Sequence, residues 1–232
     1  MIRGKSQGAV HAFREAVKFK RNSWEIWDNY SNVAWDTGNI GLTLEAVKMV
    51  LNLSFNKHCN VGLLDKVMTN LEEQATHLND NEEAESIGNI SDDANKETMR
   101  SSQLLGTMGD ILQKIVGSET SNPEIWGLYA RWHKSKGSLM DCSKDLRNQV
   151  RSLQGSGVWH DKKTFTKFAQ ASLQLCKVYM EISSTTENKQ DLLSAEMHLR
   201  SSLKQATDFQ GTEEYKALGD CLVELQDLIG AV

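Results

Sequence analysis

A spacing of 34 residues between Gly4 and Gly38 constrains the fold of this chain more than any other feature of its sequence. The residues around the two glycines repeat at the same interval. The aligned pairs are Ala9 with Thr43, Phe13 with Val47, and Ala16 with Val50. Two amphipathic helices with their turns use about 34 residues, so this period is typical of stacked helix–turn–helix repeats. The sequence therefore predicts an all-α fold.

The same pattern returns later in the chain at an offset of 99 residues, close to three repeat lengths. Residues 24–30 (WEIWDNY) match residues 123–129 (PEIWGLY), and each segment reaches a glycine eleven residues after its second-turn tryptophan. The matched positions are Trp27 with Trp126, Tyr30 with Tyr129, Gly38 with Gly137, and Val47 with Leu146. These positions have helical spacing and predict two equivalent helix pairs.

Each repeated position has a physical reason. Trp27 and Tyr30 are three residues apart, so both lie on one face of a helix and fill the gap to its partner. Gly38 and Gly137 are expected to end a helix where the chain turns with a positive φ, which a residue without Cβ tolerates. By the same numbering Gly4 is expected to end a preceding helix.

This pattern resembles the tetratricopeptide repeat family, whose motif runs Trp, Leu, Gly, Tyr, Gly, Ala, Phe, Ala, Pro. The places of that motif are taken by Ala9, Phe13, Ala16, Trp27 and Gly38. Small apolar residues are expected where Thr43, Cys142 and Gln149 stand, so the third unit is degenerate. The order of residues 12–16, 24–30 and 124–130 is more closely similar to the C-terminal part of the tetratricopeptide repeat protein 27 family.

The resemblance and the helical periodicity together predict a right-handed α-solenoid of tetratricopeptide-like helix pairs with about ten helices. The predicted segments are two repeats over 1–57 (the first truncated), a further solenoid helix over 58–78, an acidic flexible linker over 79–97, degenerate repeats over 98–155, and C-terminal capping helices over 158–232.

The predicted linker is strongly acidic and poor in large apolar residues. Its acidic residues are Asp80, Glu82, Glu83, Glu85, Asp92, Asp93 and Glu97. Against them stands one base, Lys96, so the segment buries too little apolar surface to offset the entropy of ordering. A site for a metal ion or a basic partner is the alternative, although the acidic residues lack the spacing of an EF-hand.

The repeat numbering places the beginning of this sequence inside a repeat. We therefore expect a fragment, a truncated gene model or a short isoform of a longer protein. Without a partner helix, Val10, Phe13 and Val17 are expected to contribute to an exposed apolar patch unless the chain shifts to cover them.

Composition gives little support to several classes of function. The net charge is −5, which provides no broad attraction to nucleic acid or to an acidic membrane surface. The sequence shows no secretory signal and no apolar stretch long enough to span a bilayer, so we expect a cytoplasmic or nuclear location. The four cysteines are scattered, which favours reduced thiols over disulfides or a zinc site.

Motifs for catalysis are missing, and we expect neither an enzyme nor a cofactor or metal. Gly4-Lys5-Ser6 lacks the upstream glycine and the strand of a phosphate-binding loop. His160 and Asp161 are adjacent and could form a catalytic pair. The alternative is that they are surface residues without a catalytic role.

The predicted function is binding of a protein or peptide on the face formed by the first helices of the repeats. By motif position this face carries Glu25, Asp28, Asn32, Trp35, Asp36, Glu124, Gly127, Arg131, Lys134 and Ser135. Trp35 beside three carboxylates suits a basic or amphipathic peptide. The alternative is that a neighbouring helix covers Trp35. Trp24 and Trp132 are expected to be packing residues.

Some tetratricopeptide domains hold the acidic C-terminus of chaperones in a clamp of lysine, asparagine and arginine. Here Asn29 matches that clamp, but Glu25, Asp28 and Glu124 stand where bases are needed and would repel the ligand, so we predict no clamp. The resemblance implies a scaffold or assembly factor for larger complexes. A structural C-terminal buttress without its own partner, or a truncated non-functional isoform, remains the alternative.

Overall fold

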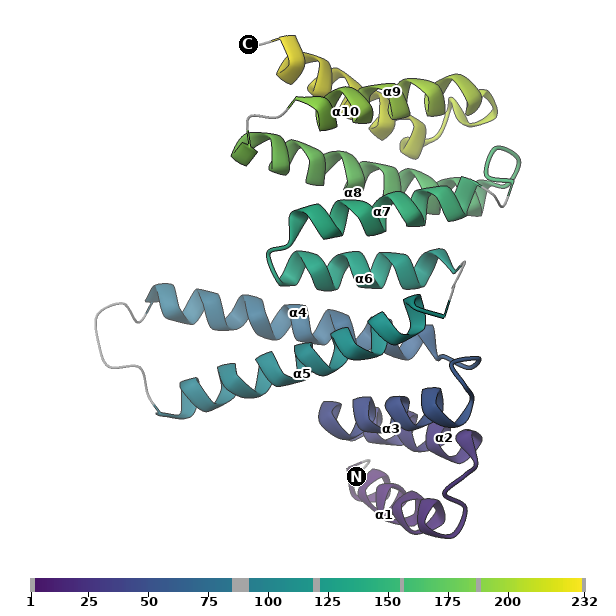
Figure 1. Ribbon diagram of the computed structural model, residues 1–232, viewed down its shortest axis with the longest axis vertical. Coiled ribbons are helices and arrows are strands. Elements are labelled where there is room, and N and C mark those ends of the chain that lie inside the picture. The colour runs from purple at the N-terminus through teal and green to yellow at the C-terminus, as the bar shows by residue number, and fades with distance from the viewer. Residues whose placement is uncertain (1–2, 85–91, 119–121, 155–156, 187–188, 231–232) are drawn as a thin grey trace. The chain divides into compact units, whose positions relative to one another are not determined.

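The computed structural model describes residues 3–84, 92–118, 122–154, 157–186 and 189–230, and these residues form helices and the loops between them (Figure 1). The predicted all-α fold of helix pairs is therefore confirmed. The helices are α1 (Arg3–Phe19), α2 (Trp24–Asp36), α3 (Ile40–Leu53), α4 (Val61–Ala84), α5 (Asp92–Val116), α6 (Pro123–Ser135), α7 (Leu139–Gln154), α8 (Lys162–Thr186), α9 (Gln190–Gln205), the short 3-10 helix η1 (Thr207–Phe209) and α10 (Glu213–Gly230).

The chain divides into two compact units, Met1–Thr120 (unit 1) and Ser121–Val232 (unit 2). In unit 1, α2 packs against both α1 and α3, α4 pairs with α5, and α3 also contacts α5. The sequence analysis grouped the segment of α5 with the degenerate repeats that follow it. In the structure α5 instead packs within unit 1, because its apolar stripe is buried there.

The turns of the two equivalent hairpins have the predicted backbone geometry. Gly38 and Gly137 both have a φ of 73°, in the left-handed region that glycine adopts without a Cβ clash. Asn39 then caps α3 by accepting a hydrogen bond from the backbone of Leu42. Gly4 differs, because α1 begins at Arg3 and its helical register continues through this glycine. The predicted turn at Gly4 is thus wrong.

Of the two outcomes left open for Val10, Phe13 and Val17, the structure shows the covered one, with Val17 buried and the other two half-buried. Val17 is 7% exposed and forms a cluster with Tyr30 and Ala46, and Val10 and Phe13 pack against that cluster. The Phe13 ring lies 6.4 Å from the Tyr30 ring. These residues are covered because α1 turns its apolar face onto the α2–α3 hairpin, which provides an apolar surface in place of the absent partner helix.

Helices α4 and α5 enter the segment that the sequence predicts as a linker. α4 continues to Ala84 and α5 begins at Asp92, so residues 79–84 and 92–97 are helical. Extending a helix that has already formed adds one hydrogen bond for each residue fixed, so these turns continue the helices from their buried parts. Residues 85–91 lie outside the described residues, and the flexibility of the segment stays a prediction.

Unit 2 is built around α8, which contacts α7, α9 and α10. The rings of Phe165 on α8 and Phe209 on η1 are stacked with their centroids 4.3 Å apart. Trp159 packs edge-on against Phe168 at 5.2 Å. Phe165 and Phe168 are both 0% exposed, so the C-terminal helices have a continuous aromatic and aliphatic core.

Candidate functional site

The row of α2 residues at helical spacing that was predicted to bind a ligand is partly occupied by the chain itself. Trp24, Asp28 and Asn32 meet the loop between α3 and α4. The His58 ring lies 4.1 Å from the Trp24 ring, and its Nε2 is 3.8 Å from Oδ2 of Asp28. Asn60 donates a hydrogen bond to Oδ1 of Asn32 at 3.4 Å. The packing role predicted for Trp24 fits this geometry.

The remaining predicted residues of α2 lie towards its two ends. Glu25 is exposed near the beginning of the helix and accepts a hydrogen bond from the Ser23 hydroxyl at 2.7 Å. That hydrogen bond lowers the pKa of the Glu25 carboxyl, so it stays ionised. Asp36 is exposed at the other end, and Trp35 beside it is half-buried.

The equivalent helix α6 faces α8 and forms two ion pairs with it. Glu124 accepts a hydrogen bond from Lys167 at 2.6 Å, and Lys134 lies 3.6 Å from Glu181. Both pairs are largely exposed, so each contributes little to stability. Arg131 lies between them on α6 and is half-buried. This row therefore carries both signs of charge, whereas the ionised groups of the α2 row are acidic.

A small recess is lined by residues of α6, α7 and α8, among them Gln149, which packs against Gly127 of α6. A Cβ at this position would lie 2.5 Å from Nε2 of Gln149, so the missing side chain makes room for the glutamine of α7. Oε1 of Gln149 is buried and has no hydrogen-bond partner among the described residues. The recess has a volume of about 180 Å³. Its lining residues are Pro123, Glu124, Gln149, Leu153, Lys167, Gln170, Ala171 and Gln174.

A polar pair inside the α6–α7 hairpin was not anticipated from the sequence. His133 Nδ1 donates a hydrogen bond to Oδ2 of Asp145 at 2.7 Å, and the Asp145 side chain is 8% exposed. Burial raises the pKa of the Asp145 carboxyl, and the hydrogen bond from His133 opposes that shift. The Tyr129 and Trp132 rings cover the imidazole, with centroids 4.4 Å and 4.9 Å from it.

The internal offset of 99 residues contains the signal for this pair. His133 and Asp145 fall opposite Ala34 and Ala46, which are both 0% exposed in the α2–α3 hairpin. Two polar residues that replace two buried alanines at matched positions indicate that the residues contact each other, because neither can be buried alone. By the same offset of 99 residues, Gly127 falls opposite Asp28.

Asp161 of the adjacent pair His160 and Asp161 caps a helix, and the cysteines are reduced. Asp161 accepts hydrogen bonds from the backbone and the hydroxyl of Thr164 at 2.7 Å and 2.6 Å, which caps α8 and lowers the pKa of its carboxyl. Burial raises the pKa of the Cys59 thiol to about 12. The cysteines are free thiols. Within the described ranges, no cluster of histidine, cysteine and acidic side chains is suited to hold a metal ion.

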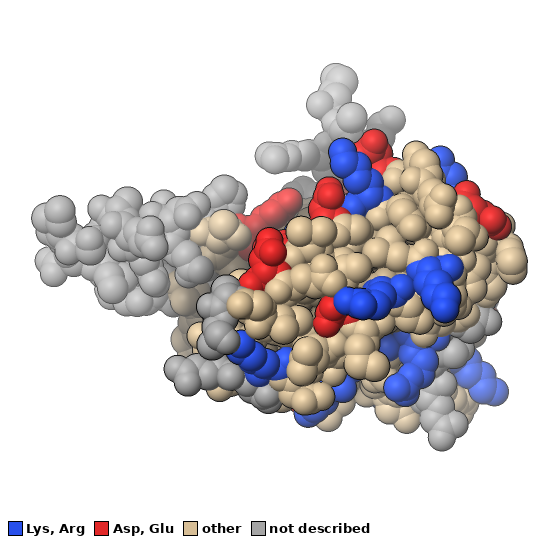
Figure 2. Space-filling model, turned by 90° about the horizontal axis from the view of Figure 1, so that it is seen from above, with Lys and Arg blue, Asp and Glu red and all other residues tan. Residues whose placement is uncertain are grey.

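The surface carries both signs of charge. Figure 2 shows basic and acidic side chains together on one face, among uncharged residues. For the part of the chain that the structure describes, no helix combines the length and the apolar character needed to cross a membrane.

Comparisons with known proteins give two curated relatives at low identity. The chain is 24% identical over 213 residues to "Tetratricopeptide repeat protein 27 homolog" of Dictyostelium discoideum, which covers 91% of this chain and 22% of that protein. It is 21% identical over 179 residues to "TPR repeat-containing protein C19B12.01" of Schizosaccharomyces pombe, which covers 75% of this chain and 19% of that protein. The predicted resemblance to tetratricopeptide repeat proteins is confirmed.

Two further comparisons add less. The crystal structure of the P58(IPK) TPR domain aligns with 98% of this chain and 70% of its own, at 12% identity and a TM-score of 0.25. No family model matches the sequence. The chain spans about a fifth of the length of the curated relatives that it matches.

Proposed function

We propose that this chain is a non-enzymatic helical-repeat module that binds another protein, as the C-terminal part of a larger tetratricopeptide repeat protein that supports complex assembly. One observation carries this proposal: α2 and α6 occupy the same place in equivalent hairpins and bury their apolar face while charged side chains stay exposed. The buried residues include Tyr30 and Ala34 on α2 and Ile125, Leu128 and Ala130 on α6.

The α2 face favours a basic or amphipathic peptide. Glu25 and Asp36 stand exposed near opposite ends of the helix, about 16 Å apart along its axis, with half-buried Trp35 next to Asp36. A peptide with an apolar side chain against Trp35 and cations near the two carboxylates matches this arrangement. Asp28 and Asn32 contribute less, because the α3–α4 loop already contacts them.

The α6 face supports the same role with mixed charge. Lys134 is held by an exposed ion pair with Glu181, which costs little free energy to exchange for a ligand carboxylate. Arg131 lies one helical turn before Lys134 on α6. We propose no chaperone carboxylate clamp here, since Glu25, Asp28 and Glu124 occupy the places of its bases. We also propose action without a cofactor, in the cytosol or nucleus.

The test measures, by calorimetry, binding of a synthetic peptide to the full chain. The peptide is amphipathic, with lysine and leucine at helical spacing. Trp35→Ala and Asp36→Lys are each expected to weaken binding about tenfold, since each removes a principal contact. Glu45→Lys changes an exposed charge on α3 and is the matched control. Equal affinities for all four proteins, or no binding by the wild type, argue against the proposed face.

A structural buttress is the second candidate function, and the contacts of His58 with Trp24 and Asp28 favour it. These contacts fill part of the face that a ligand needs. If the chain is only a buttress, His58→Ala lowers the melting temperature and no variant of Trp35 or Asp36 changes binding of any peptide.

A further inference from the structure

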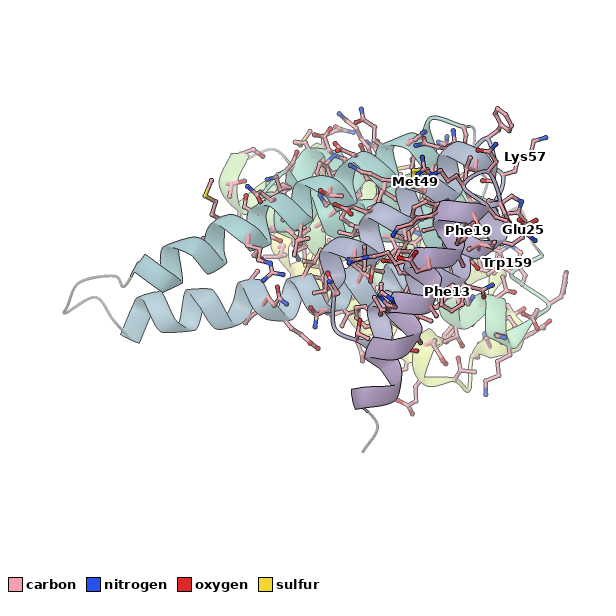
Figure 3. All side chains as sticks on the ribbon, turned by 90° about the horizontal axis from the view of Figure 1, so that it is seen from below. Phe13, Phe19, Glu25, Met49, Lys57 and Trp159 are labelled. Carbon is pink, nitrogen blue, oxygen red and sulfur yellow. The ribbon has the colours of Figure 1, made fainter. Side chains whose placement is uncertain are left out.

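We propose that unit 1 carries a second interaction surface, formed by two loops at the N-terminal end of α2, that binds an acidic amphipathic segment of another protein. We call it the loop-end surface and define it by Phe19, Lys20, Arg21, Phe55 and Lys57. Figure 3 shows Phe19, Glu25 and Lys57 at the same end of this unit.

Both loops are fixed on the first turn of α2. The Trp27 indole donates a hydrogen bond to the carbonyl of Arg21 at 3.0 Å, which holds the α1–α2 loop. The Trp24 ring contacts the ring of His58 at 4.1 Å, which holds the α3–α4 loop. Trp24 and Trp27 are three residues apart, so they are neighbours on the helix surface. The loop-end surface is therefore a preformed patch with two aromatic anchors.

The two phenylalanines of this patch face solvent. Phe19 is 86% exposed and Phe55 is 83% exposed, the largest values among the exposed large hydrophobic residues of the described chain. Single exposed apolar residues are ordinary, but here Phe19 ends α1 and Phe55 lies on the α3–α4 loop, and both segments are held at the first turn of α2. Covering both rings is the main gain that a partner obtains.

The backbone is strained where it exposes the Phe55 ring to solvent. Phe55 and Asn56 have φ values of 54° and 60°, in the left-handed region that a bulky residue rarely adopts. The conformation is fixed by the Asn56 N–H, which donates to Leu51 at 2.8 Å, and by the Lys57 N–H, which donates to Ser54 at 3.1 Å. Strained residues held by their surroundings concentrate at binding sites.

The charge of the patch selects an acidic partner. Lys20, Arg21 and Lys57 are exposed, and among the described residues none of them forms an ion pair. Glu25 accepts a hydrogen bond from the neutral Ser23 hydroxyl and keeps its charge, and the half-buried Asp28 faces His58. The three cations therefore outnumber the one exposed carboxylate beside them. A segment with apolar side chains for the two phenylalanines and carboxylates for the three cations is complementary.

A protein segment fits this patch better than a lipid surface does. Glu25 is exposed and ionised beside the cations, and an anionic bilayer would repel it. A peptide can instead place a donor group there. The loop-end surface lies about 18 Å along α2 from Asp36, so it does not include Trp35 or Asp36. The proposed basic-peptide face adjoins it at Glu25.

The test measures binding of a labelled acidic amphipathic peptide of glutamate, leucine and phenylalanine to the full chain by fluorescence anisotropy. We expect saturable binding that weakens as salt rises, and about tenfold weaker binding for each of Phe19→Ser, Phe55→Ser and Lys57→Glu. Met197→Ser, which removes a side chain that is 72% exposed on α9, is the control and is expected to bind normally. Circular dichroism verifies that each variant is folded.

Four outcomes overturn the proposal. They are equal binding by the Phe19→Ser/Phe55→Ser double variant, equal binding of a lysine version of the peptide, binding of phosphatidylserine vesicles without binding of the acidic peptide, and self-association that Phe19→Ser abolishes. Trp35→Ala is expected to leave acidic-peptide binding unchanged, so this test is independent of the proposed function.

Discussion

Replacing His133 by alanine is expected to destabilise unit 2 by about 3 kcal/mol at neutral pH, because it leaves the Asp145 carboxylate buried without its hydrogen bond. The pair is short, at 2.7 Å, and the Asp145 side chain is 8% exposed, so water cannot replace the lost donor fully. Removing one partner of a buried pair costs about 3–5 kcal/mol, and we expect the lower end because the raised pKa of Asp145 makes its protonation easier. Urea denaturation followed by circular dichroism measures the change.

The double variant His133→Ala/Asp145→Ala separates the pair from the packing. Ala34 and Ala46 fill the equivalent positions of the α2–α3 hairpin, so two alanines are compatible with this geometry. We expect the double variant to lose about 1–2 kcal/mol, less than His133→Ala alone. Lys134→Ala, which removes an exposed ion pair from the same helix, is the control and is expected to change stability by about 0.5 kcal/mol or less.

The pH dependence has a defined sign. Burial raises the pKa of Asp145 in the folded state, so the stability from its protonated form is present below the unfolded pKa of about 3.9 and is lost as pH rises through the folded pKa. Without His133 the folded pKa rises further. The penalty of His133→Ala is therefore expected to be smaller at about pH 5 than at about pH 7. An equal penalty at both pH values, or a double variant as unstable as the sum of the single variants, refutes the reasoning.

Three further predictions concern unit 2. Gly127→Ala is expected to stabilise the chain by about 0.5–1 kcal/mol in a Gln149→Ala background, where only the helix propensity of alanine acts. In the wild type the gain is expected to be smaller, because the new Cβ displaces Gln149. Equal gains in the two backgrounds, measured by urea denaturation, contradict this. Phe165→Ala is expected to cost about 3–5 kcal/mol because its ring is 0% exposed and stacked on Phe209, and a loss below about 1 kcal/mol in the same assay contradicts it. Burial lowers the pKa of His198, so its contribution to stability is full above the unfolded pKa of about 6.5 and is lost as pH falls towards the folded pKa. NMR titration measures that pKa, and His198→Gln is expected to reduce the loss of stability on acidification.

The periodicity was sufficient to predict the repeated hairpins, because their geometry depends on local features. Gly38 and Gly137 provide the positive φ of the turn, and Trp27 and Tyr30 form the aromatic wedge, with ring centroids 6.0 Å apart. These features lie within a few residues of one another. A single sequence with an internal copy therefore contains them.

The features that depend on long-range packing could not be read in the same way. His58 contacts Asp28 across 30 positions of sequence, and nothing in the local pattern around either residue indicates that the loop folds back on α2. Gly4 shows the opposite error, since the fixed period assigned it a turn that the helical register of α1 overrides. The candidate binding face was predicted by position along the repeat, whereas its accessibility depends on a loop whose path the period does not determine.

The uneven burial along α4 and α5 has a consequence for how unit 1 opens. The buried residues of this hairpin lie at its base and are Leu63, Leu64, Val67, Met68, Leu71, Met108, Ile111, Leu112 and Ile115. None of the residues 72–76 and 98–107 is buried, since each is either half-buried or exposed. Amide hydrogens of the outer turns should therefore exchange by local fraying, while those at the base exchange only when the whole unit unfolds. The outer turns and the base of the hairpin therefore open separately. A partner that binds the outer turns would slow amide exchange there without changing the exchange rate at the base.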